Sequence, residues 1–300
     1  MLRTRLWMGT ILVLVTAGLL ALDQLVSPPS HYFLFMTVLC VSMAAVVELI
    51  HLLGGMQCVQ GLLLVAGVPI LAASNYWRPW IALLSGGDWV PGATSLALGT
   101  FVALVFAVFI WEMATFLPVR ETPMEVNGSI DRMGRTIWVI AYLGFLPSFL
   151  LALPWLYPWE EAEYGNVALA LVIFVPKCCD IGAYCTGRLL GRHPMTPVLS
   201  PKKTWEGAVG GLTLGTLTAI GIDQWGPVPL LGRCLGREIG FGLTLGIAGM
   251  LGDLAESLVK RACRRKDASA VVPGFGGVLD VVDAVIFAAP VGYLWLGSLV

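Results

Sequence analysis

Long apolar stretches alternate with short polar segments along the whole chain. A run of about 20 apolar residues can cross a bilayer as a helix, and in lipid only helices and closed barrels satisfy every backbone polar group. The pattern therefore predicts an all-α polytopic membrane protein with about nine transmembrane helices. We expect them at residues 7–27, 32–53, 57–74, 93–116, 134–157, 166–189, 204–224, 238–262 and 277–298.

Two segments of the N-terminal half differ from ordinary membrane spans. The first apolar run, from Leu6 to about Leu22, follows two arginines as a signal peptide would, but no small-x-small cleavage site comes after it. We therefore expect a retained helix. The stretch Tyr76–Ser85 is too short to span and carries Trp77 and Arg78, which favours the membrane interface.

Composition supports lipid as the solvent. Hydrophobic residues make up 57% of the chain and charged residues only 12%, whereas soluble domains are about 25% charged. The formal net charge of −1 gives no basic character, so we expect no nucleic acid partner. The seven cysteines show no C-x-x-C spacing, so they are interpreted as packed thiols.

The distribution of basic residues predicts the orientation. If the N-terminus is cytoplasmic, 14 of the 18 Lys and Arg residues fall on the cytoplasmic side. Three fall on the other side, and Lys177 lies inside a span. Because cytoplasmic loops carry an excess of Lys and Arg, we expect a cytoplasmic N-terminus and an external C-terminus.

Charged residues at membrane depth divide the chain into two regions. The spans of residues 1–133 are nearly uncharged and are predicted to be a scaffold, whereas residues 134–300 are predicted to form the catalytic region. Charged groups at membrane depth are costly and usually line a polar cavity. The later spans contain Lys177, Asp180, Glu206, Asp253, Glu256, Asp280 and Asp283.

The first polar constellation combines Asp180-Ile-Gly-Ala-Tyr-Cys-Thr-Gly-Arg188 with Ser200-Pro-Lys-Lys-Thr-Trp-Glu-Gly207. Lys202 and Lys203 stand just before a predicted helix start, and cations beside free helix amides attract phosphate. The alternative interpretation is that these basic residues only determine topology.

The second constellation is Gly252-Asp-Leu-Ala-Glu-Ser-Leu-Val-Lys-Arg261. On a helix, Asp253, Glu256 and Lys260 share one face. Two carboxylates there would repel each other unless a cation lies between them. The alternative is a polar stripe closed by an ion pair between Glu256 and Lys260.

The third constellation joins Lys266-Asp267, the glycine-rich turn Pro273-Gly-Phe-Gly-Gly277, and the pair Asp280 and Asp283. Mg²⁺ prefers oxygen ligands and takes one or two carboxylates plus substrate phosphates. Asp253 and Asp280 could supply such a site from two helices. Together the three constellations favour phosphoryl chemistry at the cytoplasmic membrane surface, which needs positioning and charge neutralisation.

At these residues the sequence resembles the phosphatidate cytidylyltransferase family. The first two segments resemble the family's D-x-G-A-Y and S-P-K-K-T-x-E-G segments. The C-terminal signature is matched by Ser257-x-x-Lys-Arg-x₄-Lys-Asp-x₅-Pro-Gly-x-Gly-Gly277-x-x-Asp-x-x-Asp283. The resemblance covers about residues 140–300, and for the earlier spans it rests on hydropathy.

The sequence departs from the family pattern at three positions. Phe275 stands where the family commonly has His, Val281 where it has Arg, and Ala284 where it has Ser. The departures put nucleotide or phosphate contacts in doubt. Asp253, Asp280 and the Ser-Pro-Lys-Lys segment are intact, so activity is the favoured interpretation.

The resemblance implies that CTP and phosphatidic acid are converted to CDP-diacylglycerol and pyrophosphate with Mg²⁺, in an inner or plasma membrane. It implies Asp253 and Asp280 as metal ligands, with Glu256 and Asp283 in support. Phosphate neutralisation falls to Lys202, Lys203, Lys260 and Arg261. The expected substrate-binding set is completed by Ser200, Lys266, Asp267, Gly276, Gly277 and Asp180, and Asp180 could also orient Lys177.

Three rival interpretations stay open. The chain could be a related CTP-using kinase or cytidylyltransferase acting on another lipid, since an apolar tail leaves no motif. It could be a transporter, because embedded carboxylates also serve there, although the basic loops beside them favour an enzyme. It could be an inactive membrane paralogue. The oligomeric state, including a homodimer, is also left open.

Overall fold

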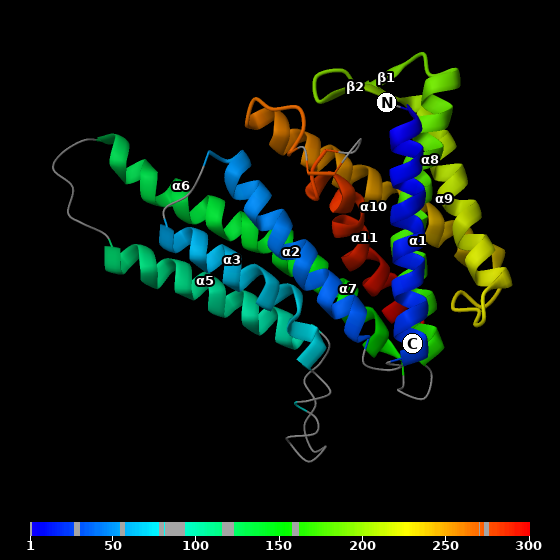
Figure 1. Cartoon of the computed structure of the whole chain (residues 1–300), viewed down its shortest axis with the longest axis horizontal. Coiled ribbons are helices and arrows are strands. Elements are labelled where there is room, and N and C mark those ends of the chain that lie inside the picture. Colours follow the sequence, from blue (N-terminus) through cyan, green and yellow to red (C-terminus); the bar gives the residue numbers. More distant parts are fainter. Residues whose placement is uncertain are drawn as a thin grey trace.

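The computed structural model describes residues 2–26, 31–54, 58–77, 81, 94–115, 123–157, 162–269, 271–272 and 276–300. Helices account for nearly all of this part of the chain (Figure 1). The N-terminal helices are α1 (Leu2–Val26), α2 (Tyr32–Leu52), α3 (Cys58–Ala72), η1 (Ser74–Trp77) and α5 (Ser95–Thr115). A long helical run follows, made of α6 (Pro123–Ile140), η2 (Ala141–Phe145), α7 (Leu146–Ala152) and η3 (Leu153–Leu156). The C-terminal elements are α8 (Ala162–Leu190), β1 (Pro194–Thr196), β2 (Ser200–Thr204), α9 (Trp205–Trp225), α10 (Leu235–Ala262) and α11 (Leu279–Gly297).

The predicted all-α membrane class is confirmed, but the count of nine spans is not. Each predicted segment forms a helix or a continuous helical run. Within the described residues, seven are long and apolar enough to cross a membrane. They are Gly9–Val26, Tyr32–Leu52, Ser95–Thr115, Gly128–Leu156, Glu163–Leu190, Leu235–Ala262 and Leu279–Gly297. The described apolar part of α3, Gln60–Ala72, is shorter, and α9 lies outside the set. The chain is an integral membrane protein.

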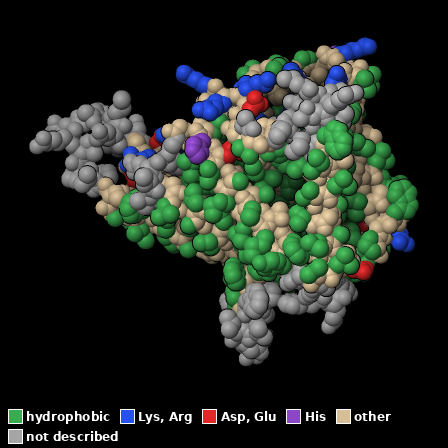
Figure 2. Space-filling view, in the orientation of Figure 1, with side chains coloured by type: hydrophobic (Ala, Val, Ile, Leu, Met, Phe, Trp, Pro, Cys, Tyr) green, Lys and Arg blue, Asp and Glu red, His purple; other side chains and the backbone are tan. Residues whose placement is uncertain are grey.

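The two ends of the bundle differ. Figure 1 shows the β1–β2 hairpin, the start of α1 and the end of α10 at one end, and the C-terminus at the other. In Figure 2, Lys and Arg side chains gather at the hairpin end, and hydrophobic side chains cover the middle. This arrangement agrees with a membrane-crossing bundle that has one basic face.

Two hydrophobic clusters hold the helices together. One includes Leu34 of α2, Val172 of α8 and Leu245 of α10. The other packs Leu49 of α2 against Leu279 of α11. Both clusters join residues from either side of position 133, so the scaffold helices pack directly on the C-terminal region. The division into a scaffold and a catalytic region remains a prediction.

Helices α8 and α9 approach each other closely because glycines face the contact. A Cβ atom on Gly182 would lie 2.8 Å from the carbonyl oxygen of Gly210, and one on Gly211 would lie 2.7 Å from the carbonyl oxygen of Cys179. Larger residues would push the helices apart. The six cysteines whose side chains are described are free, but Cys40, Cys185 and Cys234 are exposed, so only some of them are packed thiols.

The predicted interfacial segment Tyr76–Ser85 lies largely outside the described residues. Of its first two residues, Trp77 is exposed, whereas Tyr76 is buried and stacks on Phe35 with ring centroids 3.8 Å apart. Tyr76 therefore belongs to the core of the bundle.

Candidate active site

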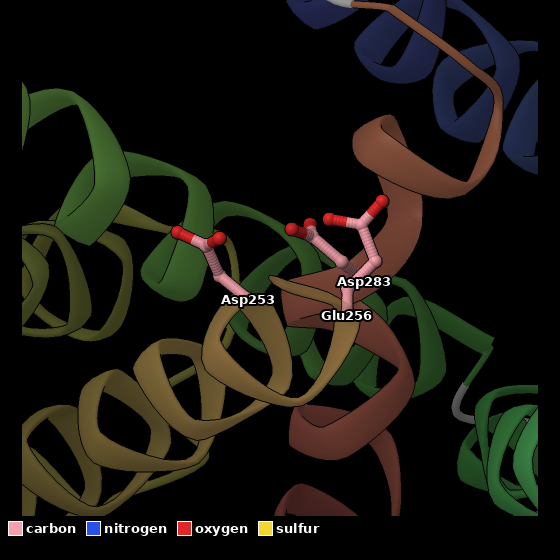
Figure 3. A group of neighbouring side chains, drawn as sticks. All are labelled: Asp253, Glu256 and Asp283. Carbon is pink, nitrogen blue, oxygen red and sulfur yellow. The ribbon is translucent and has the colours of Figure 1, made fainter. Parts of the chain in front are cut away.

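Two helices bring three membrane-depth carboxylates together. Asp253 and Glu256 lie one turn apart on α10, and Asp283 lies on the first turns of α11 (Figure 3). Each offers one oxygen, and these oxygens all lie within 4.8 Å of one another. Glu256 and Asp283 are almost fully buried, whereas Asp253 is partly exposed. The predicted sharing of one α10 face by Asp253 and Glu256 is thus seen in the structure.

Close approach of α10 and α11 makes this cluster possible. Gly252 precedes Asp253, and a Cβ atom there would overlap the backbone carbonyl oxygen of Asp283. Any side chain at this position would separate the two helices. The acidic trio therefore depends on a glycine that carries no chemistry itself.

Three lysines lie between the carboxylates. Lys203 of β2 forms an ion pair with Asp253, with Nζ 2.7 Å from Oδ2. Lys260 of α10 lies 2.6 Å from Glu256 Oε2 and also pairs with Asp280. The ion pair between Glu256 and Lys260, which was the alternative interpretation of this polar stripe, is present and lies inside the cluster.

The third lysine, Lys177 of α8, links two helices. Its Nζ lies 3.4 Å from Asp180 Oδ2 and 3.4 Å from Asp283 Oδ1. Among the described residues of this network, five carboxylates therefore face three ammonium groups. If all are ionised, the difference is two negative charges, which one divalent cation would balance.

The hairpin brings Lys203 to the site, whereas its neighbour Lys202 on β2 is exposed. Glu206 on the first turn of α9 accepts hydrogen bonds from the backbone N–H groups of Arg192 and His193, at 3.1 and 3.3 Å, and contacts the His193 ring. The α9 N-terminus is capped by Thr204, whose hydroxyl accepts a hydrogen bond from the Gly207 N–H. Glu206 therefore fixes the hairpin and is not part of the acidic cluster.

Other predicted substrate-binding residues lie around the cluster without entering it. Arg261 donates to the carbonyl oxygen of Leu199 at 3.3 Å, which ties the hairpin to α10. Ser200 begins strand β2 and is half-buried. Lys266 and Asp267 are exposed beyond the end of α10. Their expected contacts with substrate remain predictions.

Asp280, which the sequence predicts to be a metal ligand, is hydrogen-bonded to the turn before α11. Its Oδ2 accepts hydrogen bonds from the N–H groups of Gly277 and Ala268, at 2.7 and 3.3 Å, and its Oδ1 faces Lys260. Gly276 has a φ of 120°, which suits glycine in this turn. Asp280 thus holds the glycine-rich turn and touches the acidic trio through Lys260. Residues 273–275, with Phe275, lie outside the described residues.

Glu48 of α2 is a site residue that the sequence reasoning missed. Its Oε2 accepts a hydrogen bond from the Leu279 N–H at 2.8 Å, at the start of α11. A Cβ atom on Gly277 would overlap its other oxygen, so the missing side chain at Gly277 makes room for this carboxylate. The available signal was a lone carboxylate inside an apolar span, which is rarely without a role.

The residues present fit a divalent cation. Hard cations prefer carboxylate oxygens, and Asp253, Glu256 and Asp283 offer three in one cluster. Within the described part of the chain, the buried Glu256 Oε1 has no hydrogen-bond partner. That oxygen is available to a cation between α10 and α11.

Comparison with known proteins agrees with this chemistry. The chain matches the cytidylyltransferase family over residues 3–299. A phosphatidate cytidylyltransferase of Mycobacterium leprae is 32% identical over 240 residues, which cover 75% of this chain and 73% of that protein. One from Synechocystis is 36% identical over 206 residues, covering 60% and 65%. One from Staphylococcus aureus is 27% identical over 232 residues, covering 77% of each. The chain therefore belongs to the cytidylyltransferase family.

Proposed function

We propose that the protein is a phosphatidate cytidylyltransferase, which uses CTP to convert phosphatidic acid to CDP-diacylglycerol and releases pyrophosphate. The observation that carries the proposal is the interleaved cluster of carboxylates and lysines between α8, α10 and α11. It occurs in a chain whose relatives bear that name. The described apolar helices suit a diacyl lipid as one substrate.

The reaction joins two phosphates. An oxygen of the lipid phosphate forms a bond to the α-phosphorus of CTP, and the bond from that phosphorus to the bridging oxygen of the β-phosphate breaks. Pyrophosphate leaves with the electron pair. Such a transfer needs positioning and charge neutralisation and no covalent protein nucleophile.

Basic residues around the cluster would perform the neutralisation. Lys203 and Lys260 already hold ammonium groups beside the acidic trio, so each could exchange a carboxylate for a phosphate oxygen. Lys202 and Arg261 lie nearby on the hairpin and the end of α10. Ammonium and guanidinium donors form strong charge-assisted hydrogen bonds with phosphate.

We assign Asp253, Glu256 and Asp283 as the residues that would hold Mg²⁺. Bound Mg²⁺ would supply charge stabilisation for the phosphate oxygens and the departing pyrophosphate. The pairing of Asp253 with Asp280, which the sequence favours, stays a prediction. Asp280 would join the other carboxylates only after Lys260 has left it.

We further propose that the hairpin end faces the cytoplasm, with the N-terminus on the same side. The support is the excess of basic residues on the segments assigned to that side. CTP would then reach the cluster from water, and phosphatidic acid from the bilayer. A homodimer remains a prediction.

The test is product formation by purified protein in phosphatidic acid liposomes with Mg²⁺ and CTP labelled in the cytidine. We expect labelled CDP-diacylglycerol and an equal amount of pyrophosphate, with no product from a polyprenyl phosphate or from diacylglycerol. Asp253→Asn serves as the inactive control. Transfer of the γ-phosphate to diacylglycerol, followed in parallel with CTP labelled in the γ-phosphate, would instead identify a kinase. Absence of any lipid product would identify an inactive paralogue.

A further inference from the structure

Lys177 is a membrane-depth cation that has no role in the reaction proposed above. It lies within the apolar stretch of α8 and contacts Asp180 on its own helix and Asp283 on α11, each at 3.4 Å. Its side chain is 26% exposed. A lysine at this depth is costly and persists where it is paired.

Helix α11 carries two aspartates and no cation of its own. Its sequence from Leu279 to Gly297 contains Asp280 and Asp283 but no Lys or Arg. Val281 stands between these aspartates, at the position where the resembled family commonly has Arg. Val281 is only half-buried, so this position has room for a longer side chain.

We propose that Lys177 supplies, from α8, the positive charge that is missing from position 281 on α11. It holds Asp283 and Asp180 in position and limits the net negative charge that a triphosphate must approach. The inference deepens the proposed function and rests on it. Without Lys177, the same five carboxylates would face two lysines, and with every group ionised the excess would rise from two negative charges to three.

This role predicts opposite effects on two ligands. Removing the cation leaves Asp283 without its partner, so a divalent cation should bind more tightly. A nucleoside triphosphate should bind more weakly, because the site repels it more strongly. A purely structural ion pair would not move the two affinities in opposite directions. At short range in a partly buried site, one charge changes an affinity by roughly tenfold or more.

The experiment compares Lys177→Met, Lys177→Arg, and Lys177→Met combined with Val281→Arg. Mn²⁺ binding without nucleotide is measured by electron paramagnetic resonance, and the KM for CTP by product formation. Lys177→Met should raise the KM about tenfold and tighten Mn²⁺ binding several-fold. Lys177→Arg should stay near wild type, and the double variant should reverse most of both changes. Arg135→Met, which removes a cation from an exposed ion pair with Asp131 on α6, is the matched control.

Each outcome decides the proposal. Unchanged KM for CTP and unchanged Mn²⁺ affinity in Lys177→Met overturn it. It is also overturned if Lys177→Met folds with a raised KM and the added Val281→Arg does not lower that KM. If Lys177→Met does not fold, Val281→Arg in the wild-type background is decisive: added charge should weaken Mn²⁺ binding several-fold, and an unchanged affinity overturns the proposal. If the wild type makes no lipid product, the proposed function fails, while the Mn²⁺ measurements still test the role of Lys177.

Discussion

Replacing Glu48 by alanine tests whether α2 positions the start of α11. Glu48 is 8% exposed and accepts a 2.8 Å hydrogen bond from the Leu279 N–H. The residue before Leu279, Val278, gives α11 no side-chain cap. Truncation therefore leaves a buried amide without its acceptor, directly before Asp280.

The magnitude follows from the type of bond. Hydrogen bonds to charged groups contribute about 1.5–3 kcal/mol, and a buried donor that loses its partner costs about 1–3 kcal/mol. We expect Glu48→Ala to lower the free energy of unfolding by about 2–3 kcal/mol. If the whole loss acts on the geometry of Asp280 and Asp283, kcat falls roughly 30- to 150-fold, because each 1.4 kcal/mol is a factor of ten. Glu48→Gln keeps an acceptor oxygen and should lose less than tenfold.

The assay is kcat for CDP-diacylglycerol formation together with thermal unfolding in detergent. Glu112→Gln is the matched control, because Glu112 is also a buried carboxylate of the N-terminal half, but it pairs with Arg132 and Gln60 away from α11. The control should lose stability and keep kcat. Equal kcat in Glu48→Ala and wild type, or equal losses in Glu48→Ala and Glu112→Gln, would refute the positioning role.

Three further predictions concern the metal, the helix contact and the orientation. Asp253→Asn should abolish turnover and weaken Mn²⁺ binding in a folded protein, measured by activity and paramagnetic resonance; retained activity would contradict the ligand assignment. Gly252→Ala should reduce activity at least tenfold by separating α10 from α11. Gly236 lies on the same helix with open space around it, so Gly236→Ala should have little effect. Similar activities in the two variants would refute the close-contact argument. Val198 and Trp225 are 91% and 88% exposed, and each is replaced by cysteine in a background without other reactive cysteines. The two cysteines should react with an impermeant thiol reagent from opposite sides of the membrane. Labelling of both from the same side would contradict the orientation.

The sequence by itself determined the membrane class, the helices and the family. Apolar length and helical periodicity are local properties, so they predicted each helix and the common face of Asp253 and Glu256. The fixed spacing from Ser257 to Asp283 identified the family before any contact was known. The count of nine spans was less secure, because α3 and α9 form helices without the length or apolarity of the others.

Only the tertiary structure decided which charges meet. The sequence favoured Asp280 over Asp283 as a metal ligand, but the packing of α10 on α11 at Gly252 places Asp283 in the acidic trio, and the turn at Gly277 engages Asp280. The hairpin that carries Lys203 to Asp253 was expected only as a loop. Glu48 and Leu279 are 231 residues apart in the chain. Such pairings depend on how helices distant in sequence approach one another, and no local pattern encodes that distance.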